Sequence, residues 1–259
     1  MVQNLSSVHP GAKIGENVTI SPYVTIEENV VIGDNTYIYP NVVIMNGARI
    51  GNNCRIFPGA VIAGIPQDLK FRGEETTAEI GDGTTIRECA TVNRGTAAKG
   101  KTIVRNDCLL MAYSHTAHDC VLGNNVILGN ATQLAGEVNI DDYAIVSGGT
   151  LVHQFTKIGK HAMIQGGSRI GKDIPPYIIV GREPITYSGV NIIGLRRRGF
   201  DNETILSIQE IYRILYQAGL NNSDAMKQIE EKVPYSVEKE TIVSFIQNSQ
   251  RGIVRGYFE

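Results

Sequence analysis

The sequence predicts a parallel β-helix followed by a small α-helical domain, and two periodicities support this prediction. The first is an aliphatic side chain at every sixth residue, which is isoleucine at each step from Ile14 to Ile62 and which resumes in the same phase from Ile80 to Ile170. A period of six fits neither a helix nor an alternating strand, but it is typical of repeats that build a parallel β-helix. The second is a helical period that begins near Asp201.

Each six-residue repeat is expected to supply one short strand and one turn, and three repeats complete one triangular coil. The aliphatic residue points into the coil, so that equivalent residues of neighbouring coils stack about 4.8 Å apart. Glycine often follows the aliphatic residue, as at Gly15 and Gly33, and asparagine pairs such as Asn52-Asn53 and Asn124-Asn125 come next. We expect positive φ angles at these corners, which suit Gly or Asn. Thr116 breaks the later part of the series with a polar side chain.

Two segments interrupt the repeat, at 63–79 and 94–103, and the register returns in phase after each. We therefore expect both to be loops that leave an intact stack of coils. Loops on a rigid scaffold often carry function. The β-helix domain is assigned to residues 1–190 and a C-terminal helical domain to residues 191–259.

The C-terminal segment has the pattern of a few short helices. Ile205, Ile208 and Ile211 lie on one face of the first of them. Capping and helix-breaking residues predict the boundaries. These are Asp201 to Gly219 for the first helix, Ser223 or Asp224 to Lys232 for the second, and a start near Ser236 for the third.

Composition excludes several classes of protein. A net charge of −2 gives no general attraction to nucleic acid. No apolar run approaches transmembrane length, and the first residues lack the pattern of a secretory signal, so the cytoplasm is the expected location. The four cysteines lack metal-ligand spacing, and three of them occupy a repeat position that elsewhere holds small residues, so structural burial is expected in place of metal binding or a disulfide. Small and apolar residues on the flat faces predict a cyclic homotrimer, with a monomeric solenoid as the alternative.

The segment around His115, His118 and Asp119 is the richest in chemically reactive side chains. His153 follows about two coils later on nearly the same strip of the prism. Three interpretations are open: solvated corner histidines, a zinc site with three imidazoles, and general-base catalysis by His118 with an acidic neighbour. The pairing of His118 with Asp119 requires a turn, because adjacent residues of a strand point apart.

Two further segments suit a sugar nucleotide. The first interruption contains Gln67, Asp68 and Lys70, where the lysine suits a phosphate and the carboxylate suits sugar hydroxyls. Arg196 to Arg198 could bind phosphates bidentately or attract an acidic protein partner. Taken alone, either segment is more often simply a solvated surface.

Several motifs together resemble the UDP-N-acetylglucosamine O-acyltransferases, the hexapeptide-repeat enzymes that begin lipid A biosynthesis in Gram-negative bacteria. The similarity runs in family order over nearly the whole chain. It rests on the motifs QDLK at Gln67, NRGT at Asn93, HTAHDC at His115, VHQF at Val152, PPY at Pro175 and GVNIIGLRRRGF at Gly189. The resemblance implies a left-handed β-helix and transfer of an (R)-3-hydroxyacyl chain from acyl carrier protein to the 3-hydroxyl of UDP-N-acetylglucosamine.

The same resemblance assigns roles to individual residues. His118 corresponds to the general base, Asp119 to its supporting partner, and the Gly136 N–H to the oxyanion donor. The positions that match the family's substrate-binding residues are Asp68, Lys70, His115, His153, Gln154, Asn191, Arg197 and Arg198. The resemblance implies no cofactor, no metal, and a site between subunits of a homotrimer that acyl carrier protein approaches.

This chain departs from the better-known members at three places. Asn93 and Glu137 each replace a histidine, and Ile193 replaces an acidic residue. Gly166 occupies the position that limits the acyl length, and a glycine there predicts a long acyl group. An acetyl-CoA-dependent acetyltransferase of the same fold, a carbonic-anhydrase-like zinc protein and a purely structural solenoid are the alternatives.

Overall fold

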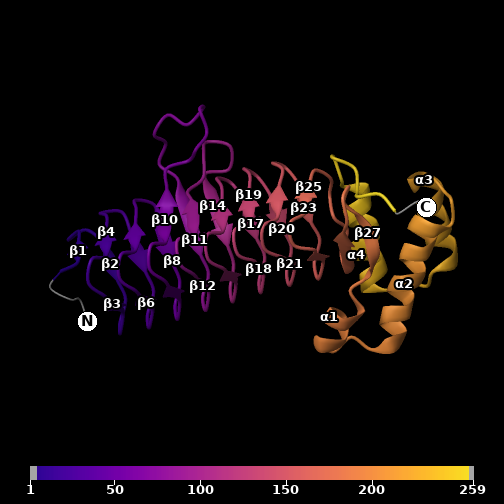
Figure 1. Ribbon diagram of the computed structural model, residues 1–259, viewed down its shortest axis with the longest axis horizontal. Helices are drawn as coiled ribbons and strands as arrows, with labels where there is room; N and C mark the ends of the chain where they lie inside the picture. Colours follow the sequence, from indigo (N-terminus) through magenta and orange to yellow (C-terminus); the bar gives the residue numbers. More distant parts are fainter. Residues whose placement is uncertain (1–4, 257–259) are drawn as a thin grey trace.

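The computed structural model describes residues 5–256, which form a long triangular prism with a helical domain at one end (Figure 1). Within these residues the prism has three sheets, of nine, eight and ten strands. All strand pairs are parallel except the last hairpin. Each coil contributes one strand to each sheet, as the period of six predicts.

The nine-stranded sheet contains β1 (Ser7–Val8), β4 (Thr25–Ile26), β7 (Val43–Ile44), β10 (Val61–Gly64), β13 (Thr91–Asn93), β16 (His115–Thr116), β19 (Gln133–Leu134), β22 (Leu151–Val152) and β25 (Arg169–Ile170). The eight-stranded sheet contains β2 (Lys13–Ile14), β5 (Val31–Ile32), β8 (Ala48–Ile50), β11 (Thr77–Ile80), β14 (Lys101–Val104), β17 (Val121–Leu122), β20 (Asn139–Ile140) and β23 (Lys157–Ile158). The ten-stranded sheet contains β3 (Thr19–Ile20), β6 (Tyr37–Ile38), β9 (Arg55–Ile56), β12 (Thr85–Ile86), β15 (Leu109–Leu110), β18 (Ile127–Leu128), β21 (Ile145–Val146), β24 (Met163–Ile164), β26 (Ile178–Gly181) and β27 (Thr186–Val190).

The core of the prism is the column of aliphatic residues that the sequence pattern identifies. Ile26 pairs with Ile44 in the next coil, and Ile44 pairs in turn with Ile62. These side chains are buried, and stacking them removes most of their apolar surface from water. Thr116 occupies the same column between Val92 and Leu134, and its buried hydroxyl makes no hydrogen bond within the described residues.

The prediction of positive φ is confirmed at the asparagine pairs, where Asn53 and Asn125 are left-handed, but it is wrong at the glycines that follow the aliphatic residues. The left-handed residues come two positions later, as at Asn17, Asn35 and Asn53. At the position directly after the aliphatic residue, glycine is required because neighbouring coils come into close contact there. A Cβ on Gly33 would lie 2.7 Å from the carbonyl carbon of Gly51 in the next coil.

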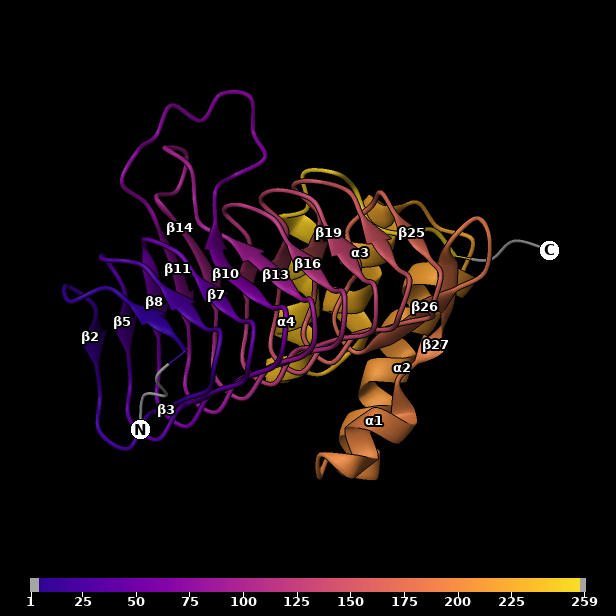
Figure 2. The same ribbon diagram turned by 60° about the vertical axis from the view of Figure 1, so that its left-hand side comes forward.

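The two interruptions are loops of 65–76 and 94–100, shorter than the segments 63–79 and 94–103 because β11 starts at Thr77 and β14 at Lys101. Stacked residues are normally 18 apart, as Asp34 and Asn52 are. Across the first loop the spacing is 30, and across the second it is 24. Both loops leave the prism from the nine-stranded sheet and rise side by side (Figure 2). The Asn93 amide joins them by donating to the Ile65 carbonyl at 3.1 Å.

Three of the four cysteines are buried, as predicted. Cys54, Cys108 and Cys120 each direct the sulfur at a backbone carbonyl of the next coil. Burial raises the pKa of Cys54 and of Cys108 to about 11. These thiols therefore stay protonated at neutral pH and serve packing.

The prism ends in a hairpin, β26–β27, which the repeat pattern does not predict. The helices that follow are α1 (Ile192–Arg197), α2 (Asn202–Gln217), α3 (Asn222–Lys232) and α4 (Val237–Gln247). Asp201 and Ser236 cap α2 and α4 as expected, but Asn221 caps α3 in place of Ser223 or Asp224. None of the helices within residues 5–256 is long and apolar enough to span a membrane.

Candidate active site

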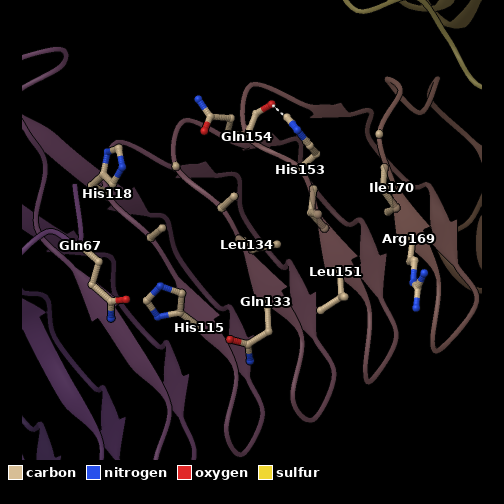
Figure 3. A pocket seen from close by; sticks show the side chains of 15 residues that line it. Gln67, His115, His118, Gln133, Leu134, Leu151, His153, Gln154, Arg169 and Ile170 are labelled. Carbon is tan, nitrogen blue, oxygen red and sulfur yellow. Dashed lines mark hydrogen bonds between the residues drawn. The ribbon is translucent and has the colours of Figure 1, made fainter. Parts of the chain in front are cut away.

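A cavity of about 740 Å³ lies along the outer surface of the nine-stranded sheet, next to the two loops. One row of lining side chains follows the strands at the coil spacing, from His115 through Gln133 and Leu151 to Arg169 (Figure 3). A second row comes from the turns that follow these strands. It consists of His118, Gly136, His153 and Gln154, and the first loop adds Gln67.

His118 and Asp119 occupy a turn directly after β16, and Asp119 has a φ of 60°. This turn brings two adjacent side chains together, which a strand could not do, so the prediction of a turn at this point is confirmed. His118 Nδ1 lies 2.9 Å from Asp119 Oδ2. Asp119 is fully buried, whereas the His118 side chain is 17% exposed and reaches the cavity. The buried carboxylate therefore orients an imidazole that remains accessible.

The second loop completes the surroundings of Asp119. Thr96 donates its backbone N–H to Oδ1 at 3.0 Å and its hydroxyl to Oδ2 at 2.6 Å. The backbone N–H of Asp119 donates to Thr102 Oγ1 at 2.8 Å. Sequence reasoning placed a loop here but missed both threonines. The interruption of the repeat was the available signal, because inserted residues leave the regular stack and can contact the turn of the next coil.

Gly136 lies directly beside the His118 ring, one coil further along. A Cβ at this position would lie 2.5 Å from both Cε1 and Nε2 of His118, closer than real Cβ contacts allow. The Gly136 carbonyl accepts from the Phe155 N–H at 3.2 Å. Glycine is therefore required here so that the imidazole can fit against the backbone.

The neighbouring polar groups of the cavity come from three elements. His118 Nε2 lies 4.0 Å from Asp68 Oδ2 in the first loop. Asp68 Oδ1 accepts the backbone N–H of Lys70, whose side chain is exposed and does not line the cavity. His115 Nδ1 lies 2.7 Å from the Thr91 hydroxyl. Burial lowers the pKa of His115, and His118 nearby lowers it further, so His115 is neutral at pH 7.

His153 and Gln154 form the far end of the cavity. The His153 ring is exposed, and its Nδ1 lies 3.1 Å from the Gln154 carbonyl (Figure 3). Within residues 5–256 no group of three or more His, Cys, Asp and Glu side chains is arranged to hold a metal ion. His115, His118 and His153 are thus not brought together as three metal ligands within the described residues of one chain.

The remaining predicted residues lie elsewhere on the chain. Asn191 caps α1 by accepting from the Gly194 N–H, and its amide donates to the His161 carbonyl at 2.9 Å. Arg198 stacks over the Tyr143 ring at 4.3 Å. Neither of them nor Arg197 lines the His118 cavity. In a single chain the predicted site is thus divided between two surfaces.

The second surface is centred on His161. Its ring stacks between those of Tyr143 and Tyr177, at 4.9 and 5.7 Å between centroids. Burial, followed by the positive charges of Arg198 and Lys160, lowers the pKa of His161 to about 4. The imidazole is therefore neutral under physiological conditions, and the positive charge of this surface comes from the arginines.

Gly166 lies in the turn after β24, outside the His118 cavity. A Cβ there would meet the Gly148 carbonyl oxygen at 3.1 Å. This contact is tight, so the neighbouring backbone would have to move by a few tenths of an ångström to admit a side chain. Gly166 itself is exposed on the outside of the prism.

The departures from the family pattern have structural counterparts in this chain. Asn93 joins the two loops, and Glu137 lies 3.7 Å from Lys99 as an ion pair. Lys99 also donates to the Asp119 carbonyl at 3.2 Å. Ile193 in α1 is exposed. The two histidine replacements thus connect the loops and the turn that surround His118.

Comparison with known proteins identifies the family. The family described as Udp N-acetylglucosamine O-acyltransferase, Domain 2, matches residues 173–254, and bacterial transferase hexapeptide repeats match residues 29–64. The acyl-[acyl-carrier-protein]--UDP-N-acetylglucosamine O-acyltransferase of Pseudomonas entomophila is 45% identical over 249 residues, which are 96% of each chain. This chain belongs to the UDP-N-acetylglucosamine O-acyltransferase family.

Solved structures of the UDP-N-acetylglucosamine O-acyltransferase family agree with this assignment. The enzyme of Bacteroides fragilis is 62% identical with a TM-score of 0.97, covering 98% of this chain and all of its own. The enzyme of Francisella novicida is 43% identical with a TM-score of 0.95, covering 98% of this chain and 94% of its own. The prediction of a left-handed parallel β-helix with a C-terminal helical domain is confirmed.

Proposed function

We propose that this chain transfers an (R)-3-hydroxyacyl group from acyl carrier protein to the 3-hydroxyl of UDP-N-acetylglucosamine, as the first step of lipid A biosynthesis in the cytoplasm. The names of its relatives support the donor and the acceptor. The observation that carries the proposal is the His118–Asp119 pair, in which a buried carboxylate orients an imidazole toward a cavity. This arrangement suits removal of a proton from a substrate hydroxyl.

His118 acts as the general base in this mechanism. Its Nδ1 faces Asp119, which leaves Nε2 to take the proton of the sugar 3-hydroxyl. As that proton leaves, the sugar oxygen forms a bond to the carbonyl carbon of the thioester. The carbon–sulfur bond then breaks, and the departing thiolate receives the proton from His118. No acyl-enzyme forms, so the buried thiols have no part in the reaction.

Gly136 supplies the oxyanion donor. Its carbonyl already accepts the Phe155 N–H, whereas its own N–H is in no hydrogen bond with the described backbone. The absence of a Cβ lets the backbone at Gly136 lie directly against the His118 ring. A backbone donor placed beside the base stabilises the negative charge that develops on the carbonyl oxygen during attack.

The sugar nucleotide binds to polar groups around the cavity and to a second copy of the chain. Asp68, His115, His153 and Gln154 surround the sugar, and Lys70 reaches toward the diphosphate. Asn191, Arg197 and Arg198 of another subunit complete the site, which explains why they lie on a separate surface of a single chain. A cyclic homotrimer provides this arrangement three times. Arg196 contributes to a basic strip that meets the acidic carrier protein.

A panel of donors distinguishes this reaction from the alternatives. Metal-stripped protein is incubated with UDP-N-acetylglucosamine and with 3-hydroxyacyl carrier proteins, unsubstituted acyl carrier proteins or acetyl-CoA. The proposal predicts transfer from the hydroxyacyl carrier proteins without added zinc. Transfer from acetyl-CoA alone, or a requirement for zinc, would show that the proposal is wrong.

Mixed oligomers test whether two copies build one site. His118→Ala and Arg198→Ala each remove one half, so either variant alone is expected to lose about 99% of its activity. In co-expressed mixtures some sites combine an intact His118 from one copy with an intact Arg198 from another. Purified mixtures should therefore regain roughly a quarter of the wild-type activity, from random pairing at each interface. No recovery in mixtures shown by tag pull-down to contain both chains would contradict a shared site.

Gly166 sets the acyl length through the space it leaves open. Gly166→Met is expected to shift donor preference toward shorter chains, because the added side chain occupies the path of a long acyl group. Competition assays with donors of graded length measure this shift. Gly166→Ala serves as the control, since a methyl group adds little length. An unchanged chain-length preference in Gly166→Met would disprove this role.

A further inference from the structure

The second loop provides most of the hydrogen bonds to the buried carboxylate of Asp119. Thr96 makes two of the three hydrogen bonds that Asp119 receives through its side chain, although it lies 23 residues earlier. Its hydroxyl oxygen also accepts the Ala98 N–H at 3.2 Å. That N–H approaches a lone pair of the Thr96 hydroxyl oxygen. The hydroxyl proton therefore points elsewhere, at Asp119 Oδ2, which is only 2.6 Å away.

This network determines where the protons lie. Asp119 Oδ1 faces a backbone N–H and Oδ2 faces a hydroxyl donor, so the carboxylate acts as an acceptor throughout. The remaining partner of Oδ2 is His118 Nδ1, at 2.9 Å, which must therefore carry a proton. In the neutral imidazole the other nitrogen, Nε2, is then unprotonated and can accept the proton of a substrate.

We propose that Thr96 is a positioning residue for the His118–Asp119 pair. Its two hydrogen bonds fix the rotation of the buried carboxylate, and the carboxylate in turn fixes the tautomer of His118 that can act as a base. The inference rests on the proposed function for its kinetic consequences, but its effect on the tautomer is independent of any substrate.

Other titratable groups lie near the same pair, and a substitution at Thr96 leaves them unchanged. Asp68 lies 4.0 Å from His118 Nε2, and His115 interacts with His118 electrostatically. Lys99 donates to the Asp119 carbonyl and pairs with Glu137. A substitution at Thr96 removes none of these charges, so a change in pH dependence can be attributed to the lost hydroxyl.

Thr96→Val and Thr96→Ser separate the hydroxyl from the shape of the side chain. In Thr96→Val we expect kcat to fall by about 10- to 100-fold, the effect of losing one hydrogen bond to a charged group. KM for UDP-N-acetylglucosamine should change little. The acid limb of the kcat/KM profile should move to higher pH, because the less stabilised carboxylate holds a proton on His118 more strongly. Thr96→Ser keeps the hydroxyl and should restore both rate and profile.

Thr102→Val is the matched control for folding. It also removes a buried hydroxyl that bonds to Asp119, but that hydroxyl contacts the backbone N–H and not the carboxylate. Both valine variants should lower the free energy of unfolding, whereas only Thr96→Val should move the pH profile. If Thr96→Val keeps the wild-type profile and kcat, or if Thr102→Val moves the profile equally, Thr96 has a structural role only and the inference is overturned.

Nitrogen-15 NMR of the His118 ring distinguishes a failure of this inference from a failure of the proposed function. Wild-type protein should show the tautomer protonated at Nδ1, and Thr96→Val should show an increased share protonated at Nε2. If wild-type protein transfers no acyl group, the proposed function is wrong and the tautomer measurement alone decides the inference. An identical tautomer ratio in wild type and Thr96→Val overturns it.

Discussion

Replacing His118 by alanine is expected to lower kcat for acyl transfer by about 10²- to 10⁴-fold, the usual contribution of a general base. No neighbouring side chain is placed to act as the base instead. His115 is hydrogen-bonded to Thr91, and Asp68 Oδ2 lies 4.0 Å from the position of His118 Nε2. The fold should persist, because Asp119 keeps both hydrogen bonds from Thr96. Initial rates at saturating UDP-N-acetylglucosamine measure the effect.

His9→Ala is a suitable control for this substitution. His9 is an exposed histidine of the first coil whose ring accepts the Gly11 N–H, far along the prism from the cavity. It should retain the wild-type rate. An equal loss in both variants would point to a general effect of removing histidine, and a wild-type rate in His118→Ala would disprove the assignment of the base.

Gly136→Ala is expected to reduce kcat almost as strongly, by about 10²-fold or more, although it adds a single methyl group. That methyl would lie 2.5 Å from two atoms of the His118 ring. The ring must then swing out of the position in which Asp119 orients it. The φ of Gly136 lies outside the left-handed region, so alanine can adopt the backbone conformation and the protein should fold.

The double variant identifies the cause of this loss. In a His118→Ala background there is no ring to displace, so adding Gly136→Ala should change the remaining rate by less than about threefold. The four rates of the mutant cycle give this coupling directly. If Gly136→Ala lowers the rate by the same factor in both backgrounds, the steric explanation is wrong and the methyl group acts on the oxyanion donor or the substrate.

The periodic part of the fold could be predicted because one physical requirement repeats. Every coil must bury one aliphatic residue per strand, so Ile26, Ile44 and Ile62 reveal the architecture without reference to distant contacts. The start of α2 was predictable for a similar reason, since its cap and its apolar face are local features. The hairpin β26–β27 was missed because its pairing depends on the end of the prism and has no repeat of its own.

The candidate site was predictable only in part. His118 and Asp119 could be predicted as a pair because they are adjacent in one motif, and the turn after β16 brings their side chains together. The role of Thr96 could not be predicted, because it depends on how a loop of irregular length returns to the prism. Asn191 was assigned to substrate binding from the resemblance. Within this chain it also caps α1 and donates its amide to the His161 carbonyl.

The most direct test of the proposed function is the identity of the product formed by the purified protein. The 3-hydroxyacyl carrier protein and UDP-N-acetylglucosamine are incubated with wild-type protein and with His118→Ala, and the product is analysed by mass spectrometry and NMR. We predict a UDP-N-acetylglucosamine ester at the sugar 3-oxygen, formed by wild type and nearly absent with His118→Ala. No ester, an ester at another oxygen, or equal yields from the two proteins would contradict the proposed reaction or its base.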